Sequence, residues 1–324
     1  MAAFTLGWLD AEGRPYEGGG GKGLRPAIAM LCAEAVGASA EAALPGAVAV
    51  ELVHAFSLVH DDIIDLDERR RHREALWKAY GVGPALLVGD ALLALAVSRL
   101  AGDAVAMSYL SRALMELVQG QMEDMAFETR PWRGPDEVTA SEYTEMAAGK
   151  TGSLLGAAAA AGVVLGGAPE LAERMWVMGR ELGIAFQIAD DLLGIWGDPA
   201  VTGKPVHSDV RRGKKTLPVL AVLAAAGPSA GAVDGQDAAT RELSDLLAGG
   251  GLAARELSDL LDSGVLDDES VRRAALLIEE AGGRKVALEL ARRHLATAME
   301  IIDECLPGAT ELRELCLAVI DRTH

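Results

Sequence analysis

Two short acidic segments hold the residues best suited to chemistry. The first reads His60-Asp61-Asp62-Ile63-Ile64-Asp65 and the second reads Phe186-Gln187-Ile188-Ala189-Asp190-Asp191. Both lie in apolar stretches with helical periodicity, where an unpaired carboxylate is costly. Asp61 and Asp65 are four residues apart, so they project from one helical face and repel each other unless a cation lies between them.

These carboxylates are typical of a magnesium site. A few hard oxygen ligands facing a cavity suit Mg²⁺ that keeps several waters and takes its other ligands from phosphate groups. Two such segments on different helices predict one pocket in which several metal ions hold a polyphosphate. His54 lies seven residues before Asp61 and points the same way, although a lone histidine on an apolar helix is often a core residue.

A polyphosphate site also needs positive charge, which this chain of net charge −18 concentrates in four places. A glycine run leads into Lys22, Arg25 and Pro26, so backbone and a helix N-terminus can approach an anion. The other three are the arginine run at residues 69–73, the pair Lys150-Thr151, and the stretch at residues 203–216. Alone, a glycine run usually indicates a loop, and an arginine run a solvated helix face. Together with two acidic segments they predict a polyphosphate site.

Composition indicates the elements that must position these groups. Hydrophobic residues make up 50% of the 324 residues and aromatic residues only 4%, which is typical of closely packed helices. We expect an all-α, single-domain protein over residues 1–324, with amphipathic helices in residues 271–324.

The same composition narrows the compartment and the partners. The sequence contains no run of eighteen apolar residues free of charge, so we expect no membrane span. The first residues lack the basic region and the apolar core of a secretory signal. Three cysteines without a pattern favour a reducing cytoplasm. The acidic balance argues against nucleic acid as a partner.

The ordered motifs resemble those of the trans-isoprenyl diphosphate synthases, the polyprenyl synthetase family. The resemblance runs from the Gly-Gly-Lys segment to at least Pro218. Its motifs are Gly20–Pro26, Asp61–Asp65, Arg70-Arg71, Gly89–Leu93, Gly120-Gln121, Lys150-Thr151, Phe186–Asp191 and Lys214–Pro218.

The resemblance implies a helical bundle around a deep central cavity, usually as a homodimer. It implies head-to-tail 1′-4 condensation of isopentenyl diphosphate with an allylic diphosphate, with three Mg²⁺ ions expected around the bound diphosphate. By position, the metal ligands would be Asp61, Asp62, Asp65, Asp190 and Asp191. The allylic diphosphate would contact Arg70, Lys150, Lys204 and Lys214. Isopentenyl diphosphate would contact Lys22, Arg25, His54 and Arg71, while Thr151 and Gln187 would line the reacting centre.

Two other functions fit part of this pattern. A class I terpene cyclase would also ionise an allylic diphosphate, but it has no use for the second anion site formed by Lys22, Arg25, His54 and Arg71. A non-catalytic partner subunit would tend to lose an acidic motif, and this chain keeps both. An elongating prenyltransferase is therefore the leading hypothesis.

Three features depart from the family pattern. Only about twenty residues precede the Gly-Gly-Lys motif, where relatives usually carry another helix, so the dimer interface is open. Gly194 stands four residues after Asp190, where many relatives have a third aspartate, which predicts slightly weaker metal binding; Asp198 could reach the site through water. Glu74-Ala75 replaces a more usual Pro-Thr, a change that the sequence does not explain.

Product length should depend on bulk below the first acidic segment. Ser57 and Phe56 precede Asp61 by four and five residues, roughly 6–7.5 Å along a helix. In the family, an aromatic residue at the Phe56 position beside a small neighbour goes with C20 products. We expect C20 first, C15 next and longer chains as the remaining alternative, although Phe56 also fits an ordinary core position.

Overall fold

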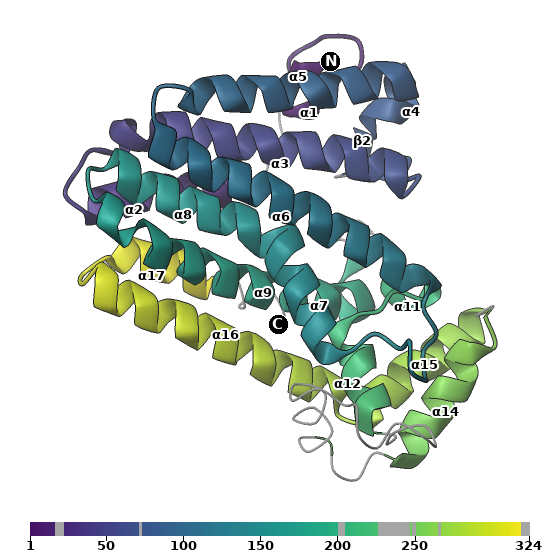
Figure 1. The fold of residues 1–324 in the computed structure, drawn as a ribbon. Coiled ribbons are helices and arrows are strands. Elements are labelled where there is room, and N and C mark those ends of the chain that lie inside the picture. The colour runs from purple at the N-terminus through teal and green to yellow at the C-terminus, as the bar shows by residue number, and fades with distance from the viewer. Residues whose placement is uncertain are drawn as a thin grey trace. The chain divides into compact units, whose positions relative to one another are not determined.

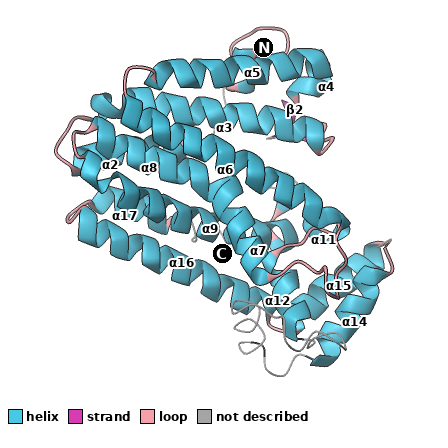
Figure 2. Cartoon of the chain, in the orientation of Figure 1, coloured by secondary structure: helices cyan, strands magenta, loops and turns pink. Residues whose placement is uncertain are grey.

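The computed structural model describes residues 1–16, 23–70, 73–199, 205–225, 247, 251–264 and 267–318. Three predicted site residues, Lys22, Arg71 and Lys204, lie outside these ranges. The described chain is helical except for one short hairpin, so the all-α prediction is confirmed (Figure 1, Figure 2). In chain order its elements are α1 (Ala2–Thr5), α2 (Leu24–Ala35), η1 (Ala40–Ala43), α3 (Leu44–Ile64), β1 (Arg69–Arg70), β2 (Arg73–Glu74), α4 (Leu76–Tyr80), α5 (Val82–Leu100), α6 (Ala104–Thr129), α7 (Ala140–Ala147), η2 (Ala148–Gly152), α8 (Ser153–Leu165), η3 (Pro169–Leu171), α9 (Ala172–Trp196), α11 (Ser208–Arg211), α12 (Leu217–Ala225), α14 (Gly251–Asp262), α15 (Asp268–Glu280), α16 (Gly283–Cys305) and α17 (Thr310–Leu317).

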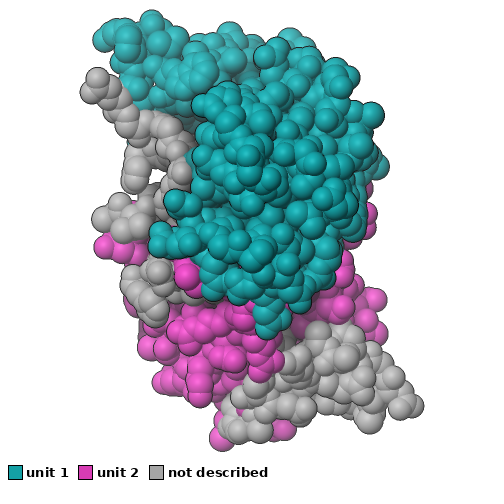
Figure 3. Space-filling model, turned by 90° about the vertical axis from the view of Figure 1, so that its left-hand side faces the viewer, with its two compact units in different colours: residues 1–115, 153–180, 299–315 teal, residues 116–152, 181–298, 316–324 magenta. Residues whose placement is uncertain are grey.

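The helices group into two compact units, coloured separately in Figure 3. Unit 1 comprises residues 1–115, 153–180 and 299–315, and unit 2 comprises residues 116–152, 181–298 and 316–324. The helices α6, α9, α16 and α17 contribute residues to both units.

In unit 1, α3 packs against α5 and α8, and α2 packs against α3 and α8. Small residues allow this close packing, because a Cβ on Gly162 of α8 would lie 2.3 Å from the Ala29 carbonyl oxygen of α2. The helix α5 buries one stripe with a spacing of three to four residues, formed by Ala85, Gly89, Leu92, Ala96 and Leu100. That stripe is the face that a solvent-side helix presents to its core.

In unit 2, α7 leads directly into η2, and α12 packs against α7, α14 and α15. A capping box starts α7, because the Glu142 backbone N–H donates to Thr139 Oγ1 and the Glu142 carboxylate accepts from the Thr139 N–H. The predicted amphipathic helices of the C-terminal third are present as α15, α16 and α17. None of the three cysteines forms a disulfide.

Among the described residues, three helical stretches are long and apolar enough to cross a membrane, judged by length and composition alone: Ala40–Ile64, Val82–Leu100 and Ala140–Leu165. Half of the first window and 89% of the third are buried inside the fold, against 22% of the second. The first and third stretches therefore have protein neighbours over much of their surface.

Candidate functional site

The first acidic motif lies where α3 ends. Asp61 and Asp62 belong to its last turn, and Asp65 caps it with a helical backbone. Asp62 is 4% exposed, and its Oδ1 accepts a hydrogen bond of 2.6 Å from Arg70 Nε. Burial raises the pKa of Asp62 to about 6, although the Arg70 guanidinium acts in the opposite direction. Asp62 is thus held by the protein, whereas Asp65 is exposed.

The described arginines of the run, Arg69, Arg70 and Arg73, lie on two paired strands, so the interpretation as a solvated helix face is wrong for them. Strands β1 and β2 are antiparallel, and Arg70 is opposite Arg73. The return of the chain after Leu66, whose φ is +55°, brings Arg70 onto Asp62. Arg73 lies on the partner strand, where its Nη2 donates to the carbonyl oxygens of Phe4 and Leu9 at 3.1 Å each.

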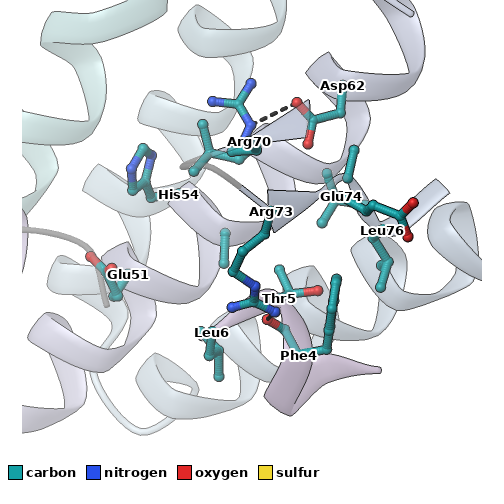
Figure 4. Close-up of a pocket in the computed structure, with 14 residues that line it drawn as sticks. Phe4, Thr5, Leu6, Glu51, His54, Asp62, Arg70, Arg73, Glu74 and Leu76 are labelled. Atoms are coloured by element: carbon teal, nitrogen blue, oxygen red, sulfur yellow. Dashed lines mark hydrogen bonds and ion pairs between the residues drawn. The ribbon is translucent and has the colours of Figure 1, made fainter. Parts of the chain in front are cut away.

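A pocket of about 70 Å³ lies beside this hairpin in unit 1 (Figure 4). Its charged and histidine lining consists of Glu51, His54 and Asp62 from α3, and Arg70, Arg73 and Glu74 from the two strands. Phe4–Leu6 contribute to its wall. The structure therefore brings together three predicted residues, His54, Asp62 and Arg70, from segments up to sixteen residues apart in sequence.

The remaining predicted residues of unit 1 lie on α2 and α3. Arg25 is in the first turn of α2, which begins after Gly23 with its left-handed φ of +61°. Phe56 and Ser57 are partly buried on α3. The Phe56 ring contacts the His60 ring edge-on, with centroids 4.7 Å apart, and Ser57 Oγ donates to the His54 carbonyl oxygen.

The second acidic motif lies on α9 in unit 2, and its two carboxylates differ. Asp191 is 2% exposed and accepts hydrogen bonds from Tyr143 OH at 2.6 Å, Leu217 N at 3.1 Å and Gln187 Nε2 at 3.1 Å. Burial raises the pKa of Asp191 to about 6, against the lowering effect of Lys214 and the Tyr143 hydroxyl. Asp190 is exposed, so it is the more open of the two carboxylates.

Thr151 and Gln187 are brought together by a π-helical turn. Thr151 lies in η2, and its Oγ1 donates to Gln187 Oε1 over 2.7 Å. Two glycines allow η2 to approach its neighbours. A Cβ on Gly183 of α9 would lie 2.1 Å from Gly152 Cα, and a Cβ on Gly120 of α6 would lie 2.4 Å from the Lys150 backbone nitrogen. Single π turns of this kind are frequent at functional sites.

The two described lysines of the predicted site lie among carboxylates. Lys150 Nζ forms an ion pair with Asp124 of α6. Burial tends to lower the pKa of Lys214, but Asp124, Asp191, Asp209 and Asp190 outweigh it and raise that pKa. The raised pKa keeps the Lys214 amine in its charged form.

The donor chemistry of both motifs fits Mg²⁺. Every charged oxygen donor in them is a carboxylate, and Lys214, which interacts with Asp190 and Asp191, suits the phosphates that would share the metal. Within the described ranges, no three His, Cys, Asp or Glu side chains are grouped closely enough to hold a metal ion by themselves. A Mg²⁺ ion here would therefore complete its shell with water and phosphate oxygens, as this ion commonly does.

Three residues of the site were not predicted: Asp124, Tyr143 and Asp209. Asp124 follows the Gly120-Gln121 motif by one helical turn, and that spacing is a usable signal. Asp209 lies inside the basic stretch at residues 203–216, where a lone acid is conspicuous. Tyr143 carries no local signal, because its role depends on a contact with Asp191, 48 residues away.

Comparisons with known proteins agree on one family. A family model described as polyprenyl synthetase matches residues 8–241. The (2E,6E)-farnesyl diphosphate synthase of Mycobacterium tuberculosis is 42% identical over 331 aligned residues, which cover 99% of this chain and 85% of the relative. The geranylgeranyl diphosphate synthase of the same organism is 39% identical, covering 94% of this chain and 81% of the relative.

The fold agrees as well. The crystal structure of polyprenyl synthetase from Streptomyces coelicolor A3(2) matches with a TM-score of 0.82 at 42% identity, covering 99% of this chain and 90% of that one.

Proposed function

Because the chain belongs to the polyprenyl synthetase family, with the all-α isoprenoid synthase fold, we propose that it is a short-chain trans-prenyltransferase. It condenses isopentenyl diphosphate with allylic diphosphates, head to tail, to C15 or C20 products. The observation that supports this most directly is the pair of acidic motifs, each with a basic group beside a buried aspartate: Arg70 on Asp62 and Lys214 near Asp191.

The chemistry requires charge stabilisation more than a nucleophile. Breaking the allylic C–O bond leaves a carbocation and a diphosphate leaving group. Bound Mg²⁺ would act as a Lewis acid that stabilises the negative charge developing on that diphosphate. Lys150, Lys214 and Arg70 stabilise the same charge by charge-assisted hydrogen bonds.

Each predicted residue has a role in this scheme. Asp61, Asp62, Asp65, Asp190 and Asp191 serve the metal ions, of which we expect three. In the described geometry Asp62 and Asp191 act from buried, hydrogen-bonded positions, and Asp61, Asp65 and Asp190 are less buried. His54 and Arg25, with Lys22 and Arg71, hold isopentenyl diphosphate, and Lys204 joins the allylic diphosphate set.

Thr151 and Gln187 offer the cation an oriented dipole. Thr151 donates its proton to Gln187 Oε1, and Gln187 Nε2 donates to Asp191. The Thr151 oxygen lone pairs and the partly negative Gln187 oxygen thus remain as the electron-rich groups of this pair. Fixed dipoles in a dry site stabilise charge without the reorganisation that water would need.

We also propose a homodimer. The helix α5 buries only one stripe and leaves Leu86, Leu87 and Leu95 at 41%, 69% and 48% exposed. Apolar side chains grouped on one helix are typical of an interaction surface, and a second copy of the chain would cover them. Light scattering of the purified protein should give twice the monomer mass. A monomer mass for the wild type, or no loss of dimer in Leu87→Glu, would contradict the proposal.

The whole chain is proposed to act as one domain in the cytoplasm. Four helices of the described chain that belong to both units support the first statement, and cysteines outside disulfides suit the second.

The activity is tested with purified protein, Mg²⁺, isopentenyl diphosphate, and dimethylallyl, geranyl or farnesyl diphosphate in turn. Mass spectrometry should find elongated C15 or C20 diphosphates, and chelation by EDTA should stop their formation. A hydrocarbon formed without isopentenyl diphosphate would indicate a cyclase instead, and no turnover with any primer would indicate a partner subunit. Asp190→Asn should lose most activity, while Asp136→Asn, which removes an exposed charge from the same unit, should not.

A further inference from the structure

The second acidic motif lacks a carboxylate that the first has. Asp61 and Asp65 are four residues apart, but the residue four positions after Asp190 is Gly194. The space beside Gly194 is filled. A Cβ placed on Gly194 would lie 2.1 Å from Asp209 Oδ2 and 2.9 Å from Asp209 Oδ1. The carboxylate of Asp209 therefore lies where the side chain of residue 194 would start.

Asp209 is held there by its neighbours in sequence. His207 N donates to the Ile195 carbonyl oxygen at 3.1 Å, and His207 Nδ1 lies 2.6 Å from the same oxygen. Ser208 Oγ lies 3.3 Å from the Gly194 carbonyl oxygen. These contacts fix the start of α11 against the last turn of α9, and so they hold the backbone of Asp209 beside Gly194.

The carboxylate of Asp209 is buried with little hydrogen bonding. Asp209 is 9% exposed. Among the described residues its carboxylate has one hydrogen bond, from Ser208 Oγ at 3.4 Å, and that single hydroxyl proton is shared with the Gly194 carbonyl. A buried carboxylate needs more than this weak contact, because burying an unpaired charge is costly. By contrast, Asp191 accepts three hydrogen bonds.

We infer that Asp209 supplies the third carboxylate of the second acidic motif, in place of residue 194, and faces the magnesium diphosphate that this motif binds. The inference rests on the proposed function, because that function provides the metal ion. In this interpretation Gly194 is required because a larger side chain would occupy the space of the Asp209 carboxylate. The second motif then keeps the same number of carboxylates. Placing an aspartate at 194 would set two carboxylates in contact, where they repel each other.

Lys214 is the basic residue that interacts with Asp209, but its single charge does not neutralise the carboxylates around it. Its amine is influenced by four carboxylates, those of Asp124, Asp190, Asp191 and Asp209. Lys150 pairs with Asp124, so two amines face four carboxylates, and the remaining excess of negative charge is one that a divalent cation would offset. A hydrogen-bonding role for Asp209 alone would not need its charge, and that difference is testable.

The test measures binding of inorganic pyrophosphate with and without MgCl₂, by calorimetry and by the shift in Tm, in the full-length protein. Asp209→Asn keeps the shape and removes the charge, and should weaken magnesium-dependent pyrophosphate binding about tenfold, as loss of a partner near a metal typically does. Gly194→Asp should weaken it at least as much and lower the Tm. The double variant Gly194→Asp/Asp209→Ala moves the carboxylate to residue 194 and should bind within about threefold of the wild type. Asp136→Asn is the control for net charge.

Each outcome decides the question. If Asp209→Asn binds magnesium pyrophosphate as the wild type does, the inference is wrong, and this holds even if Gly194→Asp fails to fold. If Gly194→Asp binds more tightly without loss of stability, residue 194 is an empty ligand position and the inference is also wrong. A double variant as weak as Gly194→Asp alone would overturn it too. Failure of the wild type to bind pyrophosphate in the presence of Mg²⁺ would instead refute the proposed function.

Discussion

A single methyl group at Gly183 should separate the two residues proposed to line the reacting centre. A Cβ at this position would lie 2.1 Å from Gly152 Cα and 2.5 Å from its nitrogen, where an ordinary contact is 3.4–4 Å. Both obstacles are backbone atoms, so no side chain can rotate away. In Gly183→Ala, η2 and α9 must therefore separate by roughly 1 Å, since closely packed interiors have no space to absorb the methyl group.

The magnitude follows from what that separation breaks. The hydrogen bond from Thr151 to Gln187 is 2.7 Å long, and adding roughly 1 Å takes it beyond hydrogen-bond distance. Overpacking costs about 1–3 kcal/mol, and a buried polar pair left unsatisfied costs about 1–3 kcal/mol more. We expect a loss of about 2–6 kcal/mol in the free energy of unfolding. Misplacement of a reacting group by about 1 Å should also reduce kcat about 100-fold.

Urea denaturation gives the stability and a steady-state assay of isopentenyl diphosphate consumption gives kcat. Gly83→Ala is the matched control, because nothing lies within 4 Å of its Cβ and its φ is ordinary; it should be neutral or slightly stabilising. The packing argument fails if Gly183→Ala is within about 0.5 kcal/mol of the wild type, which is the range of surface substitutions.

Three further perturbations test other parts of the molecule. The Arg73 guanidinium lies over the rings of Phe4 and Tyr16, 4.2 and 4.6 Å from their centroids, and donates to two carbonyl groups. In urea unfolding, Arg73→Ala should therefore lose about 2–4 kcal/mol of stability and Arg73→Lys about half of that. Equal losses in the two variants would refute a role for the shape of the guanidinium. Burial lowers the pKa of Lys215 from 10.5 to about 8. Between these values the unfolded chain keeps a proton that the native state has released, so stability should rise with pH from 8 to 10.5, and Lys215→Met should abolish the rise; an unchanged pH profile would contradict this. Phe56→Ala should lengthen the products seen by mass spectrometry, and an unchanged product length would mean that Phe56 does not limit the chain.

The sequence was informative where function depends on residues close together in the chain. Helical spacing predicted that His54, Asp61 and Asp65 share one helical stretch. His54 and Asp61 lie in α3, and Asp65 is its C-cap with a helical backbone. Motif order predicted Lys150, Thr151 and Gln187 as site residues. The structure joins Thr151 through Gln187 to Asp191 by hydrogen bonds, whereas Lys150 pairs with Asp124.

Long-range packing was not predictable in the same way. The contact between Tyr143 and Asp191, and that between Lys150 and Asp124, depend on how α6, α7 and α9 pack, which no local pattern encodes. The arginine run favoured a helix by composition, but the return of Arg70 to Asp62 requires a tight hairpin, which composition does not encode. Gly194 was interpreted as a loss because the residue that fills its space is fifteen positions further along the chain.

Both acidic motifs lie near the carboxyl ends of their helices, α3 and α9. A helix macrodipole places partial negative charge there, so aspartates at these ends oppose the field, by about 0.3–1 kcal/mol for an exposed charge. Without a cation, the repulsion between carboxylates and the unfavourable helix dipole both destabilise these helix ends. A bound cation would offset both effects. Substrate and metal should therefore stabilise the last turns of α3 and α9, so that occupancy of the site and the stability of these helix ends rise together.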